Sequence, residues 1–168
     1  MDCGNTEHMS CSDIGLSEWT VKNCKIRRVQ QHCIPKVIED CHVIGIDETG
    51  SGKTAAFALP ILQRLTEHPK PFGVFALVLT PTRELAIQLA DQFLALGFSP
   101  PLSLTVVDSR GDTKQLLAKP HLVIATPSRL KVLLQDYPEI APIFATIKVI
   151  MIIMYLAIFF FHSQNWIG

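Results

Sequence analysis

The chain has 168 residues, and its apolar fraction of 48% excludes an intrinsically disordered protein. Its 15 Lys and Arg residues balance 15 Asp and Glu residues, so the chain has no broad positive field to attract nucleic acid. Any RNA binding must therefore come from local donors, and the length fits one globular unit, or most of one.

The cysteines predict neither a zinc site nor a disulfide framework. All five lie in the first quarter of the sequence, and no two have the C-x-x-C spacing of a zinc site. The count is odd, and no apolar signal segment follows Met1. These features predict reduced thiols in a cytosolic or nuclear protein.

The N-terminal quarter divides into two regions. Residues 1–15 form a polar leader without a helix or strand pattern. Residues 16–40 predict a helical region, with a short helix over 18–24 that Ser17 caps and a second over 29–38 that Pro35 restarts.

Residues 43–59 carry the most specific pattern of the chain. An apolar run over 43–46 is followed by Asp47-Glu48-Thr49-Gly50-Ser51-Gly52-Lys53-Thr54 and then by a helix-like apolar run. A buried strand, a Gly-rich turn and a helix that opens on Gly-Lys-Thr are the parts of a phosphate-binding loop. Small residues let backbone N–H groups approach a triphosphate at a helix N-terminus, whose dipole favours anions.

This pattern predicts an ATP and Mg²⁺ site. Lys53 is the candidate catalytic cation, reaching the β- and γ-phosphates, and Thr54 is the candidate metal ligand. A Gly-rich turn without a ligand is the alternative. Asp47 stands where the strict pattern has a glycine, and its charge predicts weak nucleotide affinity unless the carboxylate points away. The predicted nucleotide-binding residues of the loop are Thr49, Gly50, Ser51, Gly52, Lys53 and Thr54.

Strands and helices alternate along the rest of the chain. The helix after the phosphate loop is predicted to reach Thr66, and a second helix, capped by Thr82, to stop at Gly97. A helical turn is expected at 115–118 and a helix from Thr126 through Leu134. Further strands are predicted at 74–79, 103–107, 121–125 and 147–153. The alternation predicts a doubly wound, mainly parallel α/β sheet with ligands at the carboxyl ends of its strands.

Three motifs in order resemble the first RecA-like domain of the DEAD-box ATP-dependent RNA helicases. Residues 49–54 are similar to their phosphate loop. Pro81-Thr82-Arg83-Glu84-Leu85 matches their motif Ia, and Thr126-Pro127-Ser128-Arg129 resembles motif Ib with Ser128 in place of Gly. The resemblance implies an α/β, RecA-like (P-loop), incomplete domain over 41–153, with ATP and Mg²⁺ as cofactors.

Motifs Ia and Ib are interpreted as a cradle for an RNA backbone. Each ends a strand and begins a helix, so it offers helix N-terminal N–H groups and an arginine to phosphate oxygens. Such contacts carry little sequence information. A capped helix start is the alternative for either motif alone. The predicted RNA-binding residues are Pro81, Thr82, Arg83, Thr126, Pro127 and Arg129.

Gln30 resembles the glutamine with which this family recognises adenine. A carboxamide can pair with the N6 donor and N7 acceptor of adenine, and an exposed helical glutamine is the alternative. The sequence around residues 30–35 most resembles that of DEAD-box helicases that act in nucleolar ribosome assembly. The resemblance therefore implies a nucleolar or nuclear protein, with the cytoplasm as a second location. Its implied partners are RNA, ATP or ADP and helicase protein cofactors, and no membrane.

Two departures from the family pattern bear on activity. The Gly-Gly turn after the third strand reads Asp108-Ser109, which weakens one RNA contact. No Asp or Glu follows Glu139, so the Asp-Glu-Ala-Asp motif after the fifth strand is replaced by apolar residues. In this family the first acid holds Mg²⁺ through water and the second orients the attacking water. The family is an ATP hydrolase, but hydrolysis by this chain is not expected.

The residues from 154 to 168 form a hydrophobic tail that is atypical of the family. We interpret it as foreign sequence from a retained intron or an altered reading frame, on a domain truncated before the acidic motif. The stretch from Met151 to Phe161 is expected to lie on or near an open sheet edge, and removal of residues 155–168 is expected to improve solubility. A non-catalytic nucleotide- and RNA-binding module and a tail-anchored membrane protein are the alternatives.

Overall fold

A computed structural model describes residues 15–16, 26–67, 73–98, 102–108, 112–154 and 157–162. The helix predicted over 18–24 and nearly all of the leader lie outside these residues.

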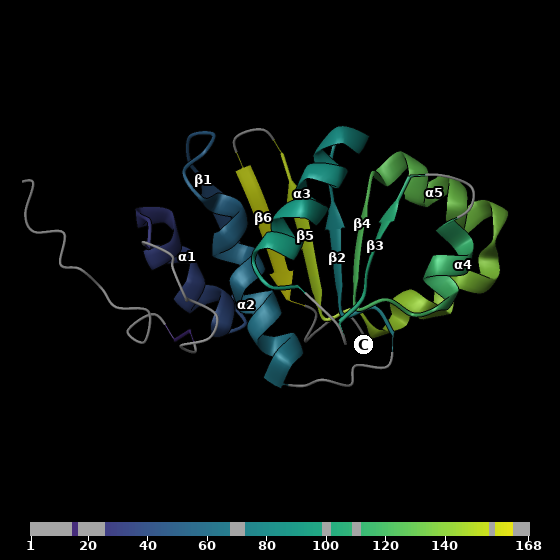
Figure 1. Cartoon of the computed structure of the whole chain (residues 1–168), viewed down its shortest axis with the longest axis horizontal. Coiled ribbons are helices and arrows are strands. Elements are labelled where there is room, and N and C mark those ends of the chain that lie inside the picture. The colour runs from purple at the N-terminus through teal and green to yellow at the C-terminus, as the bar shows by residue number, and fades with distance from the viewer. Residues whose placement is uncertain are drawn as a thin grey trace, which may run out of the picture.

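A six-stranded sheet in the order β1-β6-β5-β2-β4-β3 forms the centre of the molecule (Figure 1). The strands β2, β5, β4 and β3 pair in parallel, whereas β6 runs antiparallel to both of its neighbours, β1 and β5. Five of the six strands therefore point the same way, which confirms the predicted mainly parallel α/β fold. The strands are β1 (Val43–Ile46), β2 (Ala76–Leu79), β3 (Leu104–Val107), β4 (Leu122–Ala125), β5 (Val149–Ile153) and β6 (Ala157–His162).

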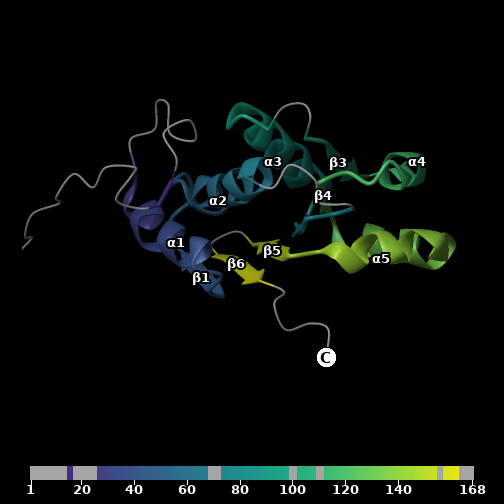
Figure 2. The same cartoon turned by 90° about the horizontal axis from the view of Figure 1, so that it is seen from below.

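Helices cover the sheet on both faces, and Figure 2 shows α2 and α3 on one face with α5 on the other. Alternate residues of β2 and β4 supply the two cores, since Val78 and Ile124 face one and Leu77 and Val123 the other. The helices are α1 (Arg28–Ile38), α2 (Lys53–Glu67), α3 (Arg83–Ala95), α4 (Asp112–Leu117), α5 (Pro127–Asp136) and the 3₁₀ helix η3 (Pro138–Thr146).

The predicted elements form with small shifts of their ends. The helix after the phosphate loop ends at Glu67, one residue later than predicted, and α3 ends at Ala95, with Gly97 in a left-handed conformation at φ 106°. The helical turn expected at 115–118 is the longer α4, which begins at Asp112. The 3₁₀ helix η3 was not predicted.

The expectation that residues 151–161 lie at an open sheet edge is wrong, because neither β5 nor β6 is an edge strand. Strand β6 lies inside the sheet, because the gap between β1 and β5 offers backbone groups of both strands as partners. Alternate residues Ile158 and Phe160 face the core, each only 1% exposed, and the Phe160 ring stacks on Phe57 with centroids 5.8 Å apart. The edges of the sheet are β1 and β3. Within the described residues, no helix has the length and apolar character needed to cross a membrane.

A polar cluster ties the end of β6 to the end of α1. His162 Nε2 lies 3.3 Å from Asp40 Oδ1, and Arg64 also pairs with Asp40. Arg64 Nη2 further donates a 2.8 Å hydrogen bond to the Ile38 carbonyl. Burial lowers the pKa of His162 below its ordinary value of 6.5; Asp40 opposes this shift, and Arg64, Lys148 and His42 add to it.

We expect this histidine to make the fold sensitive to acid. The pKa of His162 is lower in the folded state than in the unfolded state. Its contribution to the free energy of unfolding is therefore fully present above pH 6.5, and it is lost as the pH falls through the lowered pKa. In thermal melts across this pH range, the melting temperature of His162→Gln should fall less toward low pH than that of the parent chain. His32→Gln, at an exposed position, is the control and should melt like the parent at every pH.

Candidate functional site

The predicted phosphate loop has the expected strand, turn and helix context, because residues 47–52 connect β1 to α2. Gly50 and Gly52 adopt left-handed conformations with φ 82° and 95°, which glycine tolerates without strain. Lys53 is the first residue of α2 and is 8% exposed. Its Nζ donates to the carbonyl oxygens of Asp47, at 2.6 Å, and of Glu48, so the ammonium lies inside the curl of the loop.

The start of α1 holds this loop from the side. Gln30 Oε1 accepts a 2.9 Å hydrogen bond from Arg27 N, and Gln30 Nε2 donates to the Gly52 carbonyl at 3.2 Å. The Arg27 guanidinium donates to the Gly50 carbonyl. Gln30 is only 5% exposed, so the alternative of an exposed helical glutamine is wrong. Arg27 was missed because the sequence shows it only as part of a basic connection.

This packing predicts that the two loop glycines differ in their tolerance of a side chain. A Cβ on Gly52 would lie 2.7 Å from Gln30 Nε2 and 2.9 Å from Arg27 Cδ, whereas one on Gly50 meets nothing within 4 Å. Both substitutions carry the strain of a positive φ, of about 1 kcal/mol. Only Gly52→Ala should also push α1 away, and its melting temperature should fall below that of Gly50→Ala. Equal melting temperatures would contradict the contact between Gln30 and the loop.

Asp47 folds back on the loop. Its Oδ1 accepts a 2.8 Å hydrogen bond from Glu48 N. This hydrogen bond holds the pKa of the Asp47 carboxyl below its usual value, although burial opposes the shift. The carboxylate is therefore charged at neutral pH, and it is fixed on the phosphate loop by the Glu48 N–H group.

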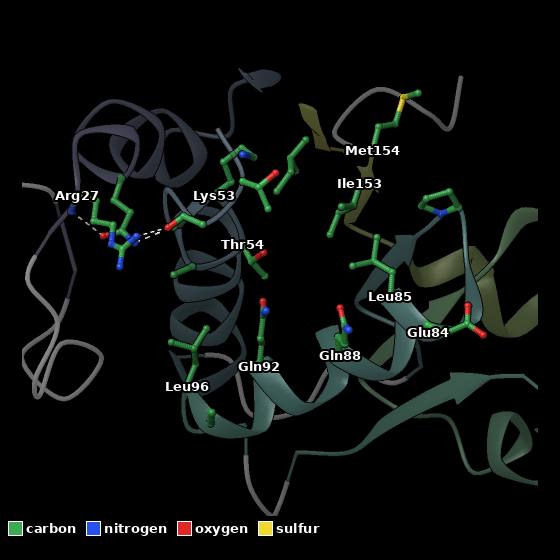
Figure 3. Close-up of a pocket in the computed structure, with 18 of the residues that line it drawn as sticks. Arg27, Lys53, Thr54, Glu84, Leu85, Gln88, Gln92, Leu96, Ile153 and Met154 are labelled. Carbon is green, nitrogen blue, oxygen red and sulfur yellow. Dashed lines mark hydrogen bonds between the residues drawn. The ribbon is translucent and has the colours of Figure 1, made fainter. Parts of the chain in front are cut away.

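A cavity of about 880 Å³ lies beside the loop (Figure 3). Of the predicted nucleotide residues, all but Ser51 line it, as do Pro81 and Thr82. The opposite wall is a face of α3 with residues at helical spacing, and Gln92 points toward Thr54. This face was missed, although its i, i+4, i+8 spacing is readable in the sequence. Its polar residues are Glu84, Gln88 and Gln92.

The end of the cavity next to β5 is apolar. Ile153 at the end of β5, Met154 directly after it and Ile158 of β6 line this side. Mg²⁺ in nucleotide sites is usually held by one or two carboxylates together with the phosphates. In the described part of the chain, no group of three or more His, Cys, Asp or Glu side chains could hold a metal ion. Thr54 is left as the one predicted ligand, so the residues present do not build a Mg²⁺ site.

The predicted RNA-binding motifs lie next to each other at the carboxyl edge of the sheet. Thr80 N donates a 3.0 Å hydrogen bond to the Ala125 carbonyl, which joins the ends of β2 and β4. Thr82 caps α3, with its hydroxyl accepting from Leu85 N at 3.3 Å. Thr126 is the N-cap of α5 without a side-chain capping bond, and Pro127 follows at the first position. Two helix N-termini therefore begin at neighbouring strand ends, and α5 also carries Arg129.

One contact of this edge is not readable from the sequence. The Arg83 guanidinium, 63% exposed, forms an ion pair with the carboxylate of Asp108, with Nη2 2.9 Å and Nε 3.1 Å from Oδ2. Asp108 stands at the position that the family fills with glycine, so the departure adds an acceptor as well as removing a flexible residue.

Comparisons with known proteins agree with this geometry. A model of the DEAD/DEAH box helicase family matches residues 27–153. DEAD-box ATP-dependent RNA helicase 36 of Arabidopsis thaliana is 50% identical over 149 residues, covering 83% of this chain and 30% of that protein. Probable ATP-dependent RNA helicase DDX49 of Mus musculus is 48% identical over 71% of this chain and 26% of its own length. The chain therefore spans about a third or less of these relatives.

A solved structure shares the fold. The structure of S. cerevisiae Dbp5 bound to RNA and ADP BeF3 superposes with a TM-score of 0.67 at 23% identity, over 83% of this chain and 37% of that one. The RecA-like architecture expected from the sequence is thereby confirmed. The folded phosphate loop, the adjacent motifs and the matched relatives lead to one conclusion: the chain belongs to the DEAD/DEAH box helicase family.

Proposed function

We propose that this chain is a nucleotide- and RNA-binding RecA-like domain, and that the parent activity is ATP-dependent RNA remodelling. One observation carries the proposal: the phosphate loop and motif Ia line one cavity, and motifs Ia and Ib open two neighbouring helices at the same edge of the sheet. Anionic groups bind well at such N-termini because unpaired N–H groups and the helix dipole point toward them.

The roles of the residues follow from their positions. Thr49, Gly50, Ser51, Gly52, Lys53 and Thr54 hold the nucleotide phosphates, and Gln30 lies beside them as the candidate adenine contact. Thr82, Arg83, Thr126 and Arg129 hold RNA phosphates, with the two prolines setting the helix starts. Thr54 is the one predicted Mg²⁺ ligand, and the described residues add no carboxylate cluster to it, so no step of the function is assigned to the metal. A role in ribosomal RNA processing in the nucleolus is the expectation from the family resemblance.

The proposal predicts nucleotide binding that depends on Lys53 and is opposed by Asp47. Lys53→Ala should weaken the binding of a fluorescent ATP analogue about 10- to 100-fold, because a charge-assisted contact to phosphate is lost. Asp47→Ala should tighten binding about two- to fivefold, because a like charge is removed from the mouth of the loop. Both constants are measured by fluorescence titration.

Two controls make this titration specific. Asp47→Asn removes the charge but retains an oxygen that can accept from Glu48 N, so it separates charge from loop geometry. Lys131→Ala removes an exposed positive charge from α5, outside the cavity, and should leave the affinity unchanged. Tight binding of the ATP analogue that Lys53→Ala does not weaken would contradict the proposed site.

A further inference from the structure

The ion pair between Arg83 and Asp108 joins two separate parts of the carboxyl edge of the sheet. Arg83 follows β2 and Asp108 follows β3, 25 residues apart in the chain, and β4 lies between these strands. Two strand spacings separate the ends of β2 and β3 by about 10 Å. The pair therefore extends across the end of β4, where Thr126 opens α5.

Asp108 is held in place for this contact. Its side chain is 24% exposed, against 63% for Arg83. Its backbone N–H donates a 2.6 Å hydrogen bond to the carboxylate of Asp112, which is only 3% exposed. The acidic partner is thus positioned by the fold, and the exposed arginine reaches over to it.

We propose that Asp108 acts as an internal substitute for an RNA phosphate, pairing with Arg83 and weakening the binding of single-stranded RNA to this edge. This inference rests on the proposed RNA binding. A carboxylate and a phosphate both present oxygen acceptors to the same guanidinium N–H groups. Only one of them can therefore pair with the Arg83 guanidinium at a time. RNA must therefore displace Asp108 before a phosphate can reach Arg83.

The expected effect is moderate, because a partly exposed ion pair is weak. Asp108→Asn should tighten the binding of a short fluorescein-labelled poly-uridine RNA about three- to tenfold at low salt, measured by anisotropy. The dependence of log affinity on log salt should also steepen by about 0.7, the value for one added phosphate contact on a single strand.

Two further variants isolate the pair. Asp91→Asn changes the net charge by the same unit at an exposed position on α3, outside the pair and the cavity, and should leave RNA affinity unchanged. In an Arg83→Ala background, Asp108→Asn should give no gain, because the arginine it would release is gone. Thermal melts of all variants show whether each is folded, and the salt slope is compared only among those that melt like the parent.

The outcomes separate this inference from the proposed function. A gain for Asp108→Asn that is absent for Asp91→Asn and abolished by Arg83→Ala supports the inference. RNA binding by the parent chain that Asp108→Asn leaves unchanged, or a gain that persists without Arg83, overturns the inference alone. An absence of RNA binding in the parent chain and in folded Asp108→Asn overturns the proposed RNA binding and the inference with it.

Discussion

Purified chain mixed with ATP, Mg²⁺ and single-stranded RNA should release no phosphate above the rate of a protein-free blank. Where the family places two acids, the end of β5 presents Ile153 and Met154, and Ile158 of β6 closes the same wall. Apolar side chains neither anchor a metal nor orient a water. Loss of one preorganised electrostatic group costs an enzyme about 10²- to 10³-fold in rate, and here the groups that act on metal and water are both replaced.

The cavity contains one carboxylate that could contradict this prediction. Glu84, at the start of α3, lines it, and Glu48 lies in the phosphate loop outside the lining. The assay is phosphate release with and without RNA by the parent chain, Lys53→Ala and Glu84→Gln. RNA-dependent release that Lys53→Ala abolishes would show that the apolar wall does not prevent hydrolysis. Its further loss in Glu84→Gln would identify that carboxylate as the group that activates water.

Removal of residues 155–168 should destabilise the chain, the reverse of what an edge position would predict. Strand β6 pairs with β1 on one side and β5 on the other, so its loss leaves the phosphate-loop strand without a partner in the described sheet. It also uncovers Phe57, on which Phe160 stacks. The soluble yield of the shortened chain should therefore fall, and its thermal transition should broaden or disappear.

A pair of point variants tests the same claim without shortening the chain. Phe160→Ala removes a side chain that is 1% exposed and should cost about 3–5 kcal/mol, a large share of the stability of a domain. Phe159→Ala, at the neighbouring and half-buried position on the other face, should cost clearly less. Equal losses in chemical denaturation, or a fully stable shortened chain, would show that β6 is not an interior strand.

The sequence predicts those parts of the site that depend on residues close together in the chain. The strand, glycines, Lys53 and Thr54 of the phosphate loop are consecutive, so their geometry follows from local turn and helix rules. The same holds for Thr82 as the cap of α3 and for Pro127 at the start of α5. Their arrangement at one edge follows from the rule that parallel strands end at the same side of a sheet.

Contacts between distant residues were not predictable in this way. Strand β6 pairs with β1 across more than 100 residues, and an uncharged apolar run indicates neither its partners nor its direction. The bonds from Arg27 and Gln30 to the loop cross 23 and 22 residues. The ion pair of Arg83 with Asp108 depends on the order of β2, β4 and β3, which sequence periodicity does not specify.

Amide hydrogen exchange with and without excess ATP shows whether the phosphate loop between β1 and α2 is the nucleotide site. ATP should slow exchange over residues 48–56, which cover the loop and the first turn of α2, and Lys53→Ala should remove this protection. Exchange in α4 and α5, which lie outside the cavity, should change little. Protection confined to other segments, or protection of the loop that persists in Lys53→Ala, would contradict the account.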